Sequence, residues 1–132
     1  CPTGGANMCT QTCVGVTCTT TCATAGDCVS NITLNAKSGP AKLICNDQCD
    51  DIVVTCSGAY ECDVDCGNGG CTNLTMNCDP EGPCSLTCNG GACPGFVHMN
   101  CEGNQCDLTC QGPGPMITQA CGNSCGCTST NC

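Results

Sequence analysis

The sequence contains almost no aromatic side chains, very few cations and no long apolar run. Among its 132 residues, Tyr60 and Phe96 are the only Tyr and Phe, Trp is missing, and Lys37 and Lys42 are the only cationic Lys or Arg side chains. Base stacking needs more aromatic residues, and binding of nucleic acids or anionic membranes needs a positive surface. No apolar run approaches the roughly 20 residues of a membrane span. The composition therefore argues against nucleic-acid binding and membrane insertion.

Cysteine dominates what is present, with 23 residues beside 18 Gly and a formal net charge of -9. Thiols at this density would be kept reduced in the cytosol, so we expect a secreted or extracellular protein whose cysteines form disulfides. A metal-thiolate cluster is the main alternative. The spacing CxxC, with which zinc sites commonly open, does not occur, and CxC occurs once, at Cys125 and Cys127. We therefore expect no metal and no other cofactor.

A repeat of about 22 residues runs through most of the chain. A short string, consisting of Cys, three residues and Cys, begins at residues 18, 62, 84 and 106, and AKLIC fits the same place from Ala41. A longer string lies between each short one and the next: CVSNITLNA from Cys28, CDDIVVTC from Cys49, CTNLTMNC from Cys71 and CPGFVHMNC from Cys93. Segments rich in Gly, Asn, Asp and Pro separate the strings, which is typical of turns.

Both kinds of string alternate between apolar and polar residues, which predicts two strands in each repeat. The residues that share a face with the cysteines are Thr20, Leu43, Val64, Leu86 and Leu108 in the short strings, and Ile32, Leu34, Ile52, Val54, Leu74, Met76, Val97, Met99 and Ile117 in the long ones. The opposite face is mostly Thr, Asn and Asp. One such unit cannot bury its apolar face alone, whereas stacked units bury a continuous core.

We therefore predict an all-β, disulfide-stapled β-solenoid with almost no helix and about five two-strand coils. Residues 1–132 form a single domain, in which 18–120 are the repeats and 1–17 and 121–132 are irregular Cys-rich caps. A chain of small independent disulfide knots, as in epidermal-growth-factor-like modules, is the alternative. Such knots lack a regular inward row of aliphatic residues.

The turns indicate how the cysteines pair. Disulfide-bonded Cα atoms lie about 4.4–6.8 Å apart, whereas Cys62 and Cys66, separated by extended residues, lie about 13 Å apart. Each turn, however, brings its flanking cysteines together, and the one turn that lacks a cysteine lacks both, at Ala36 and Ala41. We predict the pairs Cys22–Cys28, Cys45–Cys49, Cys56–Cys62, Cys66–Cys71, Cys78–Cys84, Cys88–Cys93 and Cys101–Cys106, with Cys13–Cys18 as a further pair. Bonds between cysteines stacked on adjacent coils are the alternative.

The odd number of cysteines means that at least one is free or bonds another chain. Cys110 has no cysteine near its expected partner position. We therefore expect an intermolecular bridge near the ends, with Cys1, Cys110 and Cys132 as the candidates. A missing segment of a longer precursor is the alternative explanation. No signal peptide is visible, and we interpret the chain as a mature product or as a segment of a longer one.

Stacking in register predicts particular neighbours on adjacent coils. Lys42 should lie beside Asp63, and Ile44 beside Asp65. A cross-strand pair of opposite charge contributes about 0.2–1 kcal/mol.

Two sequons, Asn31-Ile32-Thr33 and Asn73-Leu74-Thr75, fall at the same position of the repeat and on the outward face of the long strand. An extracellular eukaryotic chain passes through the compartment in which Asn-X-Ser/Thr is glycosylated. We expect N-linked glycans on Asn31 and Asn73. The alternative is that both are plain solvated side chains in a row of Thr and Asn.

No set of catalytic residues is evident, and we do not expect an enzyme. His98 is the only His, and it falls on an outward strand position without a nucleophile or an orienting partner. Asp63 and Asp65 project from one strand face and could bind Ca²⁺ weakly. Solvated charge that keeps a Cys-rich surface soluble is the simpler explanation for both, and for the Asp50–Asp51 pair.

Two resemblances follow from these residues. The string from Cys84 to Cys93, CSLTCNGGAC, and CDLTC from Cys106 resemble the Cys-rich β-solenoid repeats of microbial-eukaryote cell surfaces over residues 18–121, which implies a secreted or cell-surface structural role and names no ligand. Short stapled coils with outward Thr also resemble the insect β-solenoid antifreeze proteins, which carry regular Thr-X-Thr on one flat face. Here that ladder, at Thr10/Thr12, Thr19/Thr21 and Thr87, is interrupted by Lys42/Ile44 and Asp63/Asp65.

A solenoid has two open ends with unpaired strand edges, to which another copy can add. No acid or base precedes Asp27 or follows Asp107, so both ends are neutral. We expect a structural subunit of a secreted, glycosylated filament, appendage or coat that self-associates head to tail. The alternative is a monomeric secreted binding module, either ice-binding or adhesive and carbohydrate-binding.

Overall fold

The computed structural model describes residues 8–14, 17–22, 28, 31–46, 49–67, 70–111, 116–123 and 126–132, with the backbone alone for 8–14, 116 and 117. The described chain is all-β and contains no helix. Its strands are β1 (Met8–Val14), β2 (Cys18–Cys22), β3 (Asn31–Ser38), β4 (Ala41–Cys45), β5 (Val53–Ser57), β6 (Cys62–Cys66), β7 (Leu74–Cys78), β8 (Cys84–Cys88), β9 (Phe96–Cys101), β10 (Gln105–Cys110), β11 (Met116–Ala120) and β12 (Gly126–Thr130).

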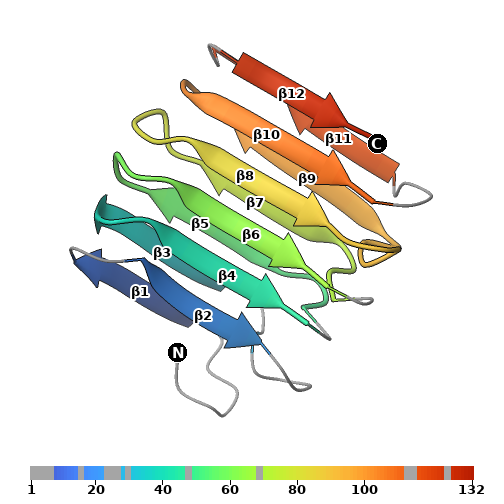
Figure 1. Cartoon of the computed structure of the whole chain (residues 1–132), viewed down its shortest axis with the longest axis horizontal. Coiled ribbons are helices and arrows are strands. Elements are labelled where there is room, and N and C mark those ends of the chain that lie inside the picture. Colours follow the sequence, from blue (N-terminus) through green and yellow to red (C-terminus); the bar gives the residue numbers. More distant parts are fainter. Residues whose placement is uncertain are drawn as a thin grey trace.

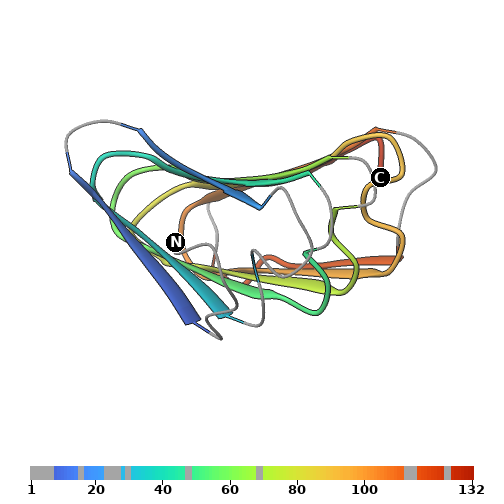
Figure 2. The ribbon, with the colours of Figure 1, turned by 90° about the horizontal axis from the view of Figure 1, so that it is seen from below.

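The strands form two parallel sheets of six strands each. Sheet A has the order β1-β3-β5-β7-β9-β11, and sheet B has the order β12-β10-β8-β6-β4-β2. Successive strands therefore alternate between the sheets, so that each coil contributes one strand to each of them (Figure 1). The two sheets face each other as two layers (Figure 2). This arrangement is the β-solenoid that the sequence predicts.

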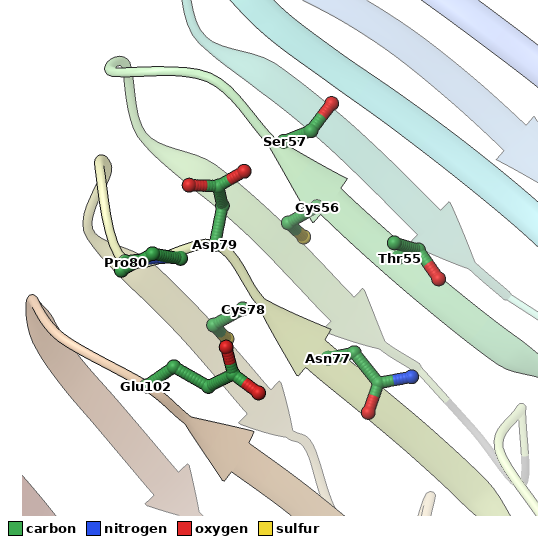
Figure 3. A pocket seen from close by; sticks show the side chains of 8 residues that line it. All are labelled: Thr55, Cys56, Ser57, Asn77, Cys78, Asp79, Pro80 and Glu102. Atoms are coloured by element: carbon green, nitrogen blue, oxygen red, sulfur yellow. The ribbon is translucent and has the colours of Figure 1, made fainter. Parts of the chain in front are cut away.

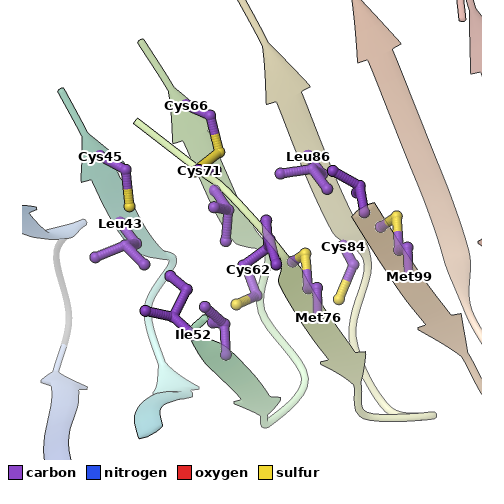
Figure 4. Close-up of a cluster of buried hydrophobic side chains, with 14 of the residues drawn as sticks. Leu43, Cys45, Ile52, Cys62, Cys66, Cys71, Met76, Cys84, Leu86 and Met99 are labelled. Carbon is purple, nitrogen blue, oxygen red and sulfur yellow. A yellow bond between two sulfur atoms is a disulfide. The ribbon is translucent and has the colours of Figure 1, made fainter. Parts of the chain in front are cut away.

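The alternation of buried and exposed residues follows from the period of two in an extended strand. Strands β4, β6, β7 and β8 all bury their first, third and fifth residues. The predicted inward aliphatic residues whose side chains are described are at most 1% exposed, and Thr20 is 6% exposed. They meet the cysteines in one continuous core between the sheets (Figure 4).

The ends differ from the expectation of irregular caps. Residues 1–17 contribute β1, which pairs with β3 with a register shift between Thr12 and Val14, and residues 121–132 contribute β12, which pairs with β10 without a shift. Four inner coils, built from β3 to β10, thus lie between an end coil at each side, rather than about five coils between caps. Backbone pairing on one side of each strand joins these segments to the neighbouring coil.

The first inner coil is shifted relative to the repeat read from the sequence. Leu34, rather than Ala36, stands opposite Cys56, and Ile32 stands opposite Val54. Strand β3 continues as far as Ser38, so that its extra length lies at the turn before Ala41. A shift of two residues keeps every side chain on its face, which is why the inward pattern is unaffected. The position without a bridge is therefore Leu34–Ala41.

No helix in the described part of the chain is long and apolar enough to cross a membrane.

Candidate functional site

Disulfides line both edges of the solenoid, where the chain turns from one sheet to the other. All seven pairs that flank the predicted turns are bonded: Cys22–Cys28, Cys45–Cys49, Cys56–Cys62, Cys66–Cys71, Cys78–Cys84, Cys88–Cys93 and Cys101–Cys106. Their Cα–Cα distances lie between 5.6 and 6.2 Å. Because the coils stack in register, bridges of successive coils form one column along each edge.

The end of the chain pairs differently from the expectation. Cys110 and Cys132, expected as candidates for an intermolecular bridge, are bonded to each other, with a Cα–Cα distance of 5.0 Å. The last coil brings them together because β12 lies beside β10, which places the residues after β12 next to Cys110. Cys121–Cys127 adds a further local bridge that the sequence reasoning left unassigned. Cys1 and the side chain of Cys13 lie outside the described residues, while Cys18 is disulfide-bonded.

Within each column, sulfur atoms of neighbouring bridges come within 4.8 Å of one another. The described residues contain three such groups: Cys22 with Cys45 and Cys49, Cys66 with Cys88 and Cys93, and Cys78 with Cys101 and Cys106. Metal binding by cysteine requires the thiolate. All of these sulfurs are engaged in disulfides, so in the oxidised chain the groups serve as buried cross-links.

The outer face of sheet B carries most of the charge on the strands. Lys42 lies beside Asp63 and Ile44 beside Asp65, which confirms the predicted register. The Lys42 Nζ donates a hydrogen bond to Asp63 Oδ2 at 2.6 Å and lies 3.6 Å from Asp65 Oδ2. The hydrogen bond to Asp63 raises the pKa of Lys42, and the negative charges of both aspartates act in the same direction, against a smaller opposing effect of burial. Asp63 and Asp65 are thus partners of a cation from the chain itself.

The outer face of sheet A is different, because its strands carry no Asp or Glu and a single Lys, Lys37 at the end of β3. One polar row consists of Thr33, Thr55, Asn77 and Asn100 on adjacent strands. Asn100 Nδ2 donates to Asn77 Oδ1 at 2.8 Å, and Ser57 Oγ donates to Asn35 in the next row. Amide and hydroxyl groups of this face are therefore held by their neighbours.

A shallow, open pocket of about 230 Å³ lies on this face at the edge of the sheet. Its lining consists of Thr55, Cys56, Ser57, Asn77, Cys78, Asp79, Pro80 and Glu102 (Figure 3). Asp79 and Glu102 come directly after the last residues of β7 and β9, and Asp79 Oδ1 accepts a hydrogen bond from the Glu81 N–H at 2.9 Å. The pocket thus combines carboxylate, amide and hydroxyl groups over buried disulfides.

Sequence reasoning did not identify Asp79 and Glu102. The signal that could have found them is their shared place in the repeat, since each directly follows the closing cysteine of a long string. The outward alternation continues past that cysteine, which brings both carboxylates to the same edge of one face.

The other singled-out residues have structural partners. Asp51 and Asn73 both have a positive φ, of 52° and 56°, and Asn73 Nδ2 donates to Asp51 Oδ1 at 2.8 Å. Asp and Asn are the residues that most readily adopt this conformation apart from Gly. The Asp50–Asp51 pair therefore includes a residue of a turn. His98 lies half-buried on β9, beside Thr75 and Thr118.

The two sequons do not occupy equivalent positions, contrary to the expectation. Asn31 stands opposite Val53, which stands opposite Thr75, so Asn31 lies two residues further along its strand than Asn73. Both asparagines are exposed. The Asn73 amide also accepts a hydrogen bond from the Phe96 N–H at 3.2 Å, so both of its ends are engaged.

Comparison of the chain with protein-family models, with curated proteins and with solved structures gave no match.

Proposed function

We propose that the protein is a structural subunit of an extracellular filament, appendage or coat, in which copies add end to end. The observation that carries this proposal is that both sheets end in uncharged strands, of which β12 pairs without a break and β1 has a register shift between Thr12 and Val14. Strands β1 and β2 are the outermost strands at one end, and β11 and β12 at the other (Figure 1). Each presents one row of backbone groups that has no further strand beside it in the described part of the chain.

The outermost strand of sheet B, β12, has little of what usually protects a sheet edge. Monomeric proteins commonly place charged residues, Pro or a bulge on an edge strand. Strand β12 has the sequence GCTST, pairs without a bulge, and exposes Thr128, Ser129 and Thr130. The charged residues of the chain lie between residues 27 and 107, so their repulsion acts on the sides of the solenoid and leaves the ends neutral.

Addition at this edge continues the parallel ladder. The two ends of the solenoid are different surfaces, so each copy uses one end to meet the other end of the next. A heterologous contact of this kind produces an open filament when the rotation does not close. Cys110 and Cys132 bond within the chain, so they are not available for a covalent link between copies.

The disulfides indicate an oxidising, extracellular type of environment. Within it, N-linked glycans are part of the proposal, and Asn31 is the favoured site because the Asn73 amide is engaged at both ends. Treatment of the native protein with peptide N-glycosidase, followed by mass spectrometry, measures whether Asn31 carries a glycan. Loss of mass at the Asn31 peptide is expected, and unmodified Asn31 in protein from a eukaryotic secretory host contradicts it.

Light scattering across a concentration series, with negative-stain microscopy of the same samples, tests end-to-end assembly. We expect the mass to rise with concentration and single-file filaments to appear. Ser129→Lys places a charge on β12, the outermost strand of sheet B, at the position that stacks on the inward-facing Leu108 of β10. This variant should abolish assembly. Thr87→Lys adds the same charge to the outer face of an inner strand and should leave assembly unchanged. A monomer at every concentration, or equal loss with both variants, would overturn the proposal.

A further inference from the structure

The pocket on the outer face of sheet A has a different chemistry from the ends of the solenoid and needs a separate explanation. It is open to solvent, and Cys56 and Cys78, in its lining, are 4% and 5% exposed. We propose that this pocket binds a neutral polysaccharide chain, whose hydroxyl groups are the recognised feature. This function goes beyond assembly and does not depend on it.

The polar groups of the pocket match the hydrogen-bonding needs of sugar hydroxyls. A hydroxyl both donates and accepts, so it is best held by groups of both kinds. Asp79 and Glu102 offer acceptors, the Thr55 hydroxyl can donate and accept, and the Asn77 amide nitrogen is a donor. The Ser57 hydroxyl already donates to Asn35, so it offers a ligand an acceptor. These five side chains come from three successive coils and line one opening (Figure 3).

The same groups are held in place before a ligand arrives. Asn100 donates to Asn77 Oδ1, and the Glu81 N–H donates to Asp79 Oδ1. These bonds orient both side chains. The Asn77 amide nitrogen and Asp79 Oδ2 are the atoms that a ligand would contact. The bridges Cys56–Cys62 and Cys78–Cys84 anchor the strand ends beneath them. A site that is ordered in advance loses less conformational entropy on binding.

The surroundings of the pocket indicate a chain of sugars rather than a single one. The row Thr33, Thr55, Asn77 and Asn100 presents one polar side chain per coil, at a spacing of about 4.8 Å between strands. Phe96, which is 60% exposed, lies on the same face of β9 but about 13 Å along the strand from Asn100, so it is not part of this row. An extended ligand along the solenoid axis contacts several coils at once.

The negative charge of the pocket and of the chain favours a neutral polymer over an anionic one. Two carboxylates in the pocket and a net charge of -9 repel phosphorylated, sulfated and uronic-acid chains. A calcium site is less well matched, because Ca²⁺ takes six to eight oxygen ligands and Asp79 already shares one oxygen with the backbone.

Co-sedimentation of the full, oxidised chain with insoluble chitin and with cellulose tests the proposal, and heparin–agarose serves as the anionic comparison. The monomer fraction from gel filtration is used, so that the result is independent of assembly. Retention by at least one neutral polysaccharide and none by heparin is expected. Absence of retention by both neutral polymers, or equal retention by heparin, overturns the proposal.

Two matched variants locate the site. Thr55→Ala should weaken binding about 2–12-fold, the equivalent of one lost hydrogen bond of about 0.5–1.5 kcal/mol. Thr87→Ala removes the same hydroxyl from the outer face of sheet B and should leave binding unchanged. The double variant Asn77→Ala/Asp79→Ala should weaken binding at least tenfold while circular dichroism and the melting temperature show that the fold is kept. Equal loss with Thr87→Ala, or saturable calorimetric binding of CaCl₂ without binding of polysaccharide, counts against the site.

Discussion

At the residue scale, the side chains of neighbouring coils form rows in which each residue meets its equivalent one turn away. Asn100 and Asn77 form an amide pair in such a row, and Ser85 Oγ donates to Asp63 Oδ1 at 2.8 Å in another. Stacking in register therefore turns a repeat in the sequence into polar ladders on both outer faces. A substitution in one coil acts first on the residues directly above and below it.

Replacement of Lys42 by Met should lower the free energy of unfolding by about 0.2–1 kcal/mol at neutral pH, because the ion pair with Asp63 is partly exposed to solvent. The folded-state pKa of Lys42 is raised above its ordinary value of 10.5 by the hydrogen bond to Asp63. The stabilisation is therefore complete below the pKa of the unfolded chain and is lost as the pH rises through the raised folded pKa.

Urea unfolding of both proteins at several pH values measures this effect. The difference between wild type and Lys42→Met should be constant from neutral pH to about pH 10 and should then shrink. Lys37→Met, which removes the same charge from an exposed position, is the control and should show little change. A difference that grows with pH would contradict the assignment.

At the scale of strands and turns, backbone fit decides which turn residues are tolerated. Gly58, in the turn after β5, has a φ of +108°, and a Cβ atom placed on it would lie 2.4 Å from the Ala36 carbonyl oxygen. Only glycine allows both this conformation and this approach between coils. The turn therefore depends on a residue that makes no side-chain contact.

Substitution of Gly58 by Ala should destabilise the chain by more than about 1 kcal/mol, because the positive φ and the contact with Ala36 act together. Gly126→Ala is the matched control, since its φ is ordinary and the nearest neighbour of an added Cβ is the Gln105 Cγ at 3.8 Å. Thermal unfolding monitored by circular dichroism compares the two. Equal melting temperatures for both variants would show that the turn can adjust.

The last coil is held by a bridge of another kind. Cys110–Cys132 spans 22 residues, whereas Cys121–Cys127 and the bridges between the inner coils span 4–6. The double variant Cys110→Ser/Cys132→Ser should lose about 3 kcal/mol of the stability of this coil, by the chain-entropy estimate for a loop of this size.

Because repeat proteins are stabilised by nearest neighbours, this loss should remain local. Hydrogen exchange should become faster in β11 and β12 and stay unchanged in β4 to β7. The control is Thr109→Ser, a mild change on the outer face of β10. Faster exchange throughout the chain would contradict local stabilisation.

At the scale of the whole molecule, the core is narrow and consists of few side chains. Aliphatic and Met residues occupy the space between the sheets, and the buried cysteines close both edges (Figure 4). Aromatic residues, which bury the largest areas in ordinary cores, are exposed here at Tyr60 and Phe96. A core of this kind relies on cross-links for its stability.

Full reduction and alkylation of the cysteines should therefore unfold the chain at room temperature. Far-ultraviolet circular dichroism should lose its β signal, and amide exchange should approach the rate of an unfolded peptide. The oxidised chain, carried through the same buffers without reductant, is the control. Protected amides in β5 to β8 of the alkylated chain would show that the aliphatic core suffices.

Much of the fold follows from local pattern. The period of two places Leu86 and Met76 inward, and the turns bring pairs such as Cys78 and Cys84 within bonding distance. Both are consequences of extended backbone geometry over a few residues, so they can be derived without knowledge of the whole. The contact between Lys42 and Asp63 also follows, because a constant repeat length determines which residues stack.

The remaining features depended on the tertiary structure, because they involve choices between coils. The shift that places Leu34 opposite Cys56 arises from pairing along the whole of β3, and the bond between Cys110 and Cys132 arises because β12 adds beside β10. The pocket required three coils to stack before Asp79 and Glu102 could share an edge with Asn77. Sequence alone determined which face each residue occupies, since that is set by the alternation within a strand. Tertiary structure decided which residues of different coils meet where the repeat changes length or ends, since register there is set by the sum of backbone hydrogen bonds along each pair of strands.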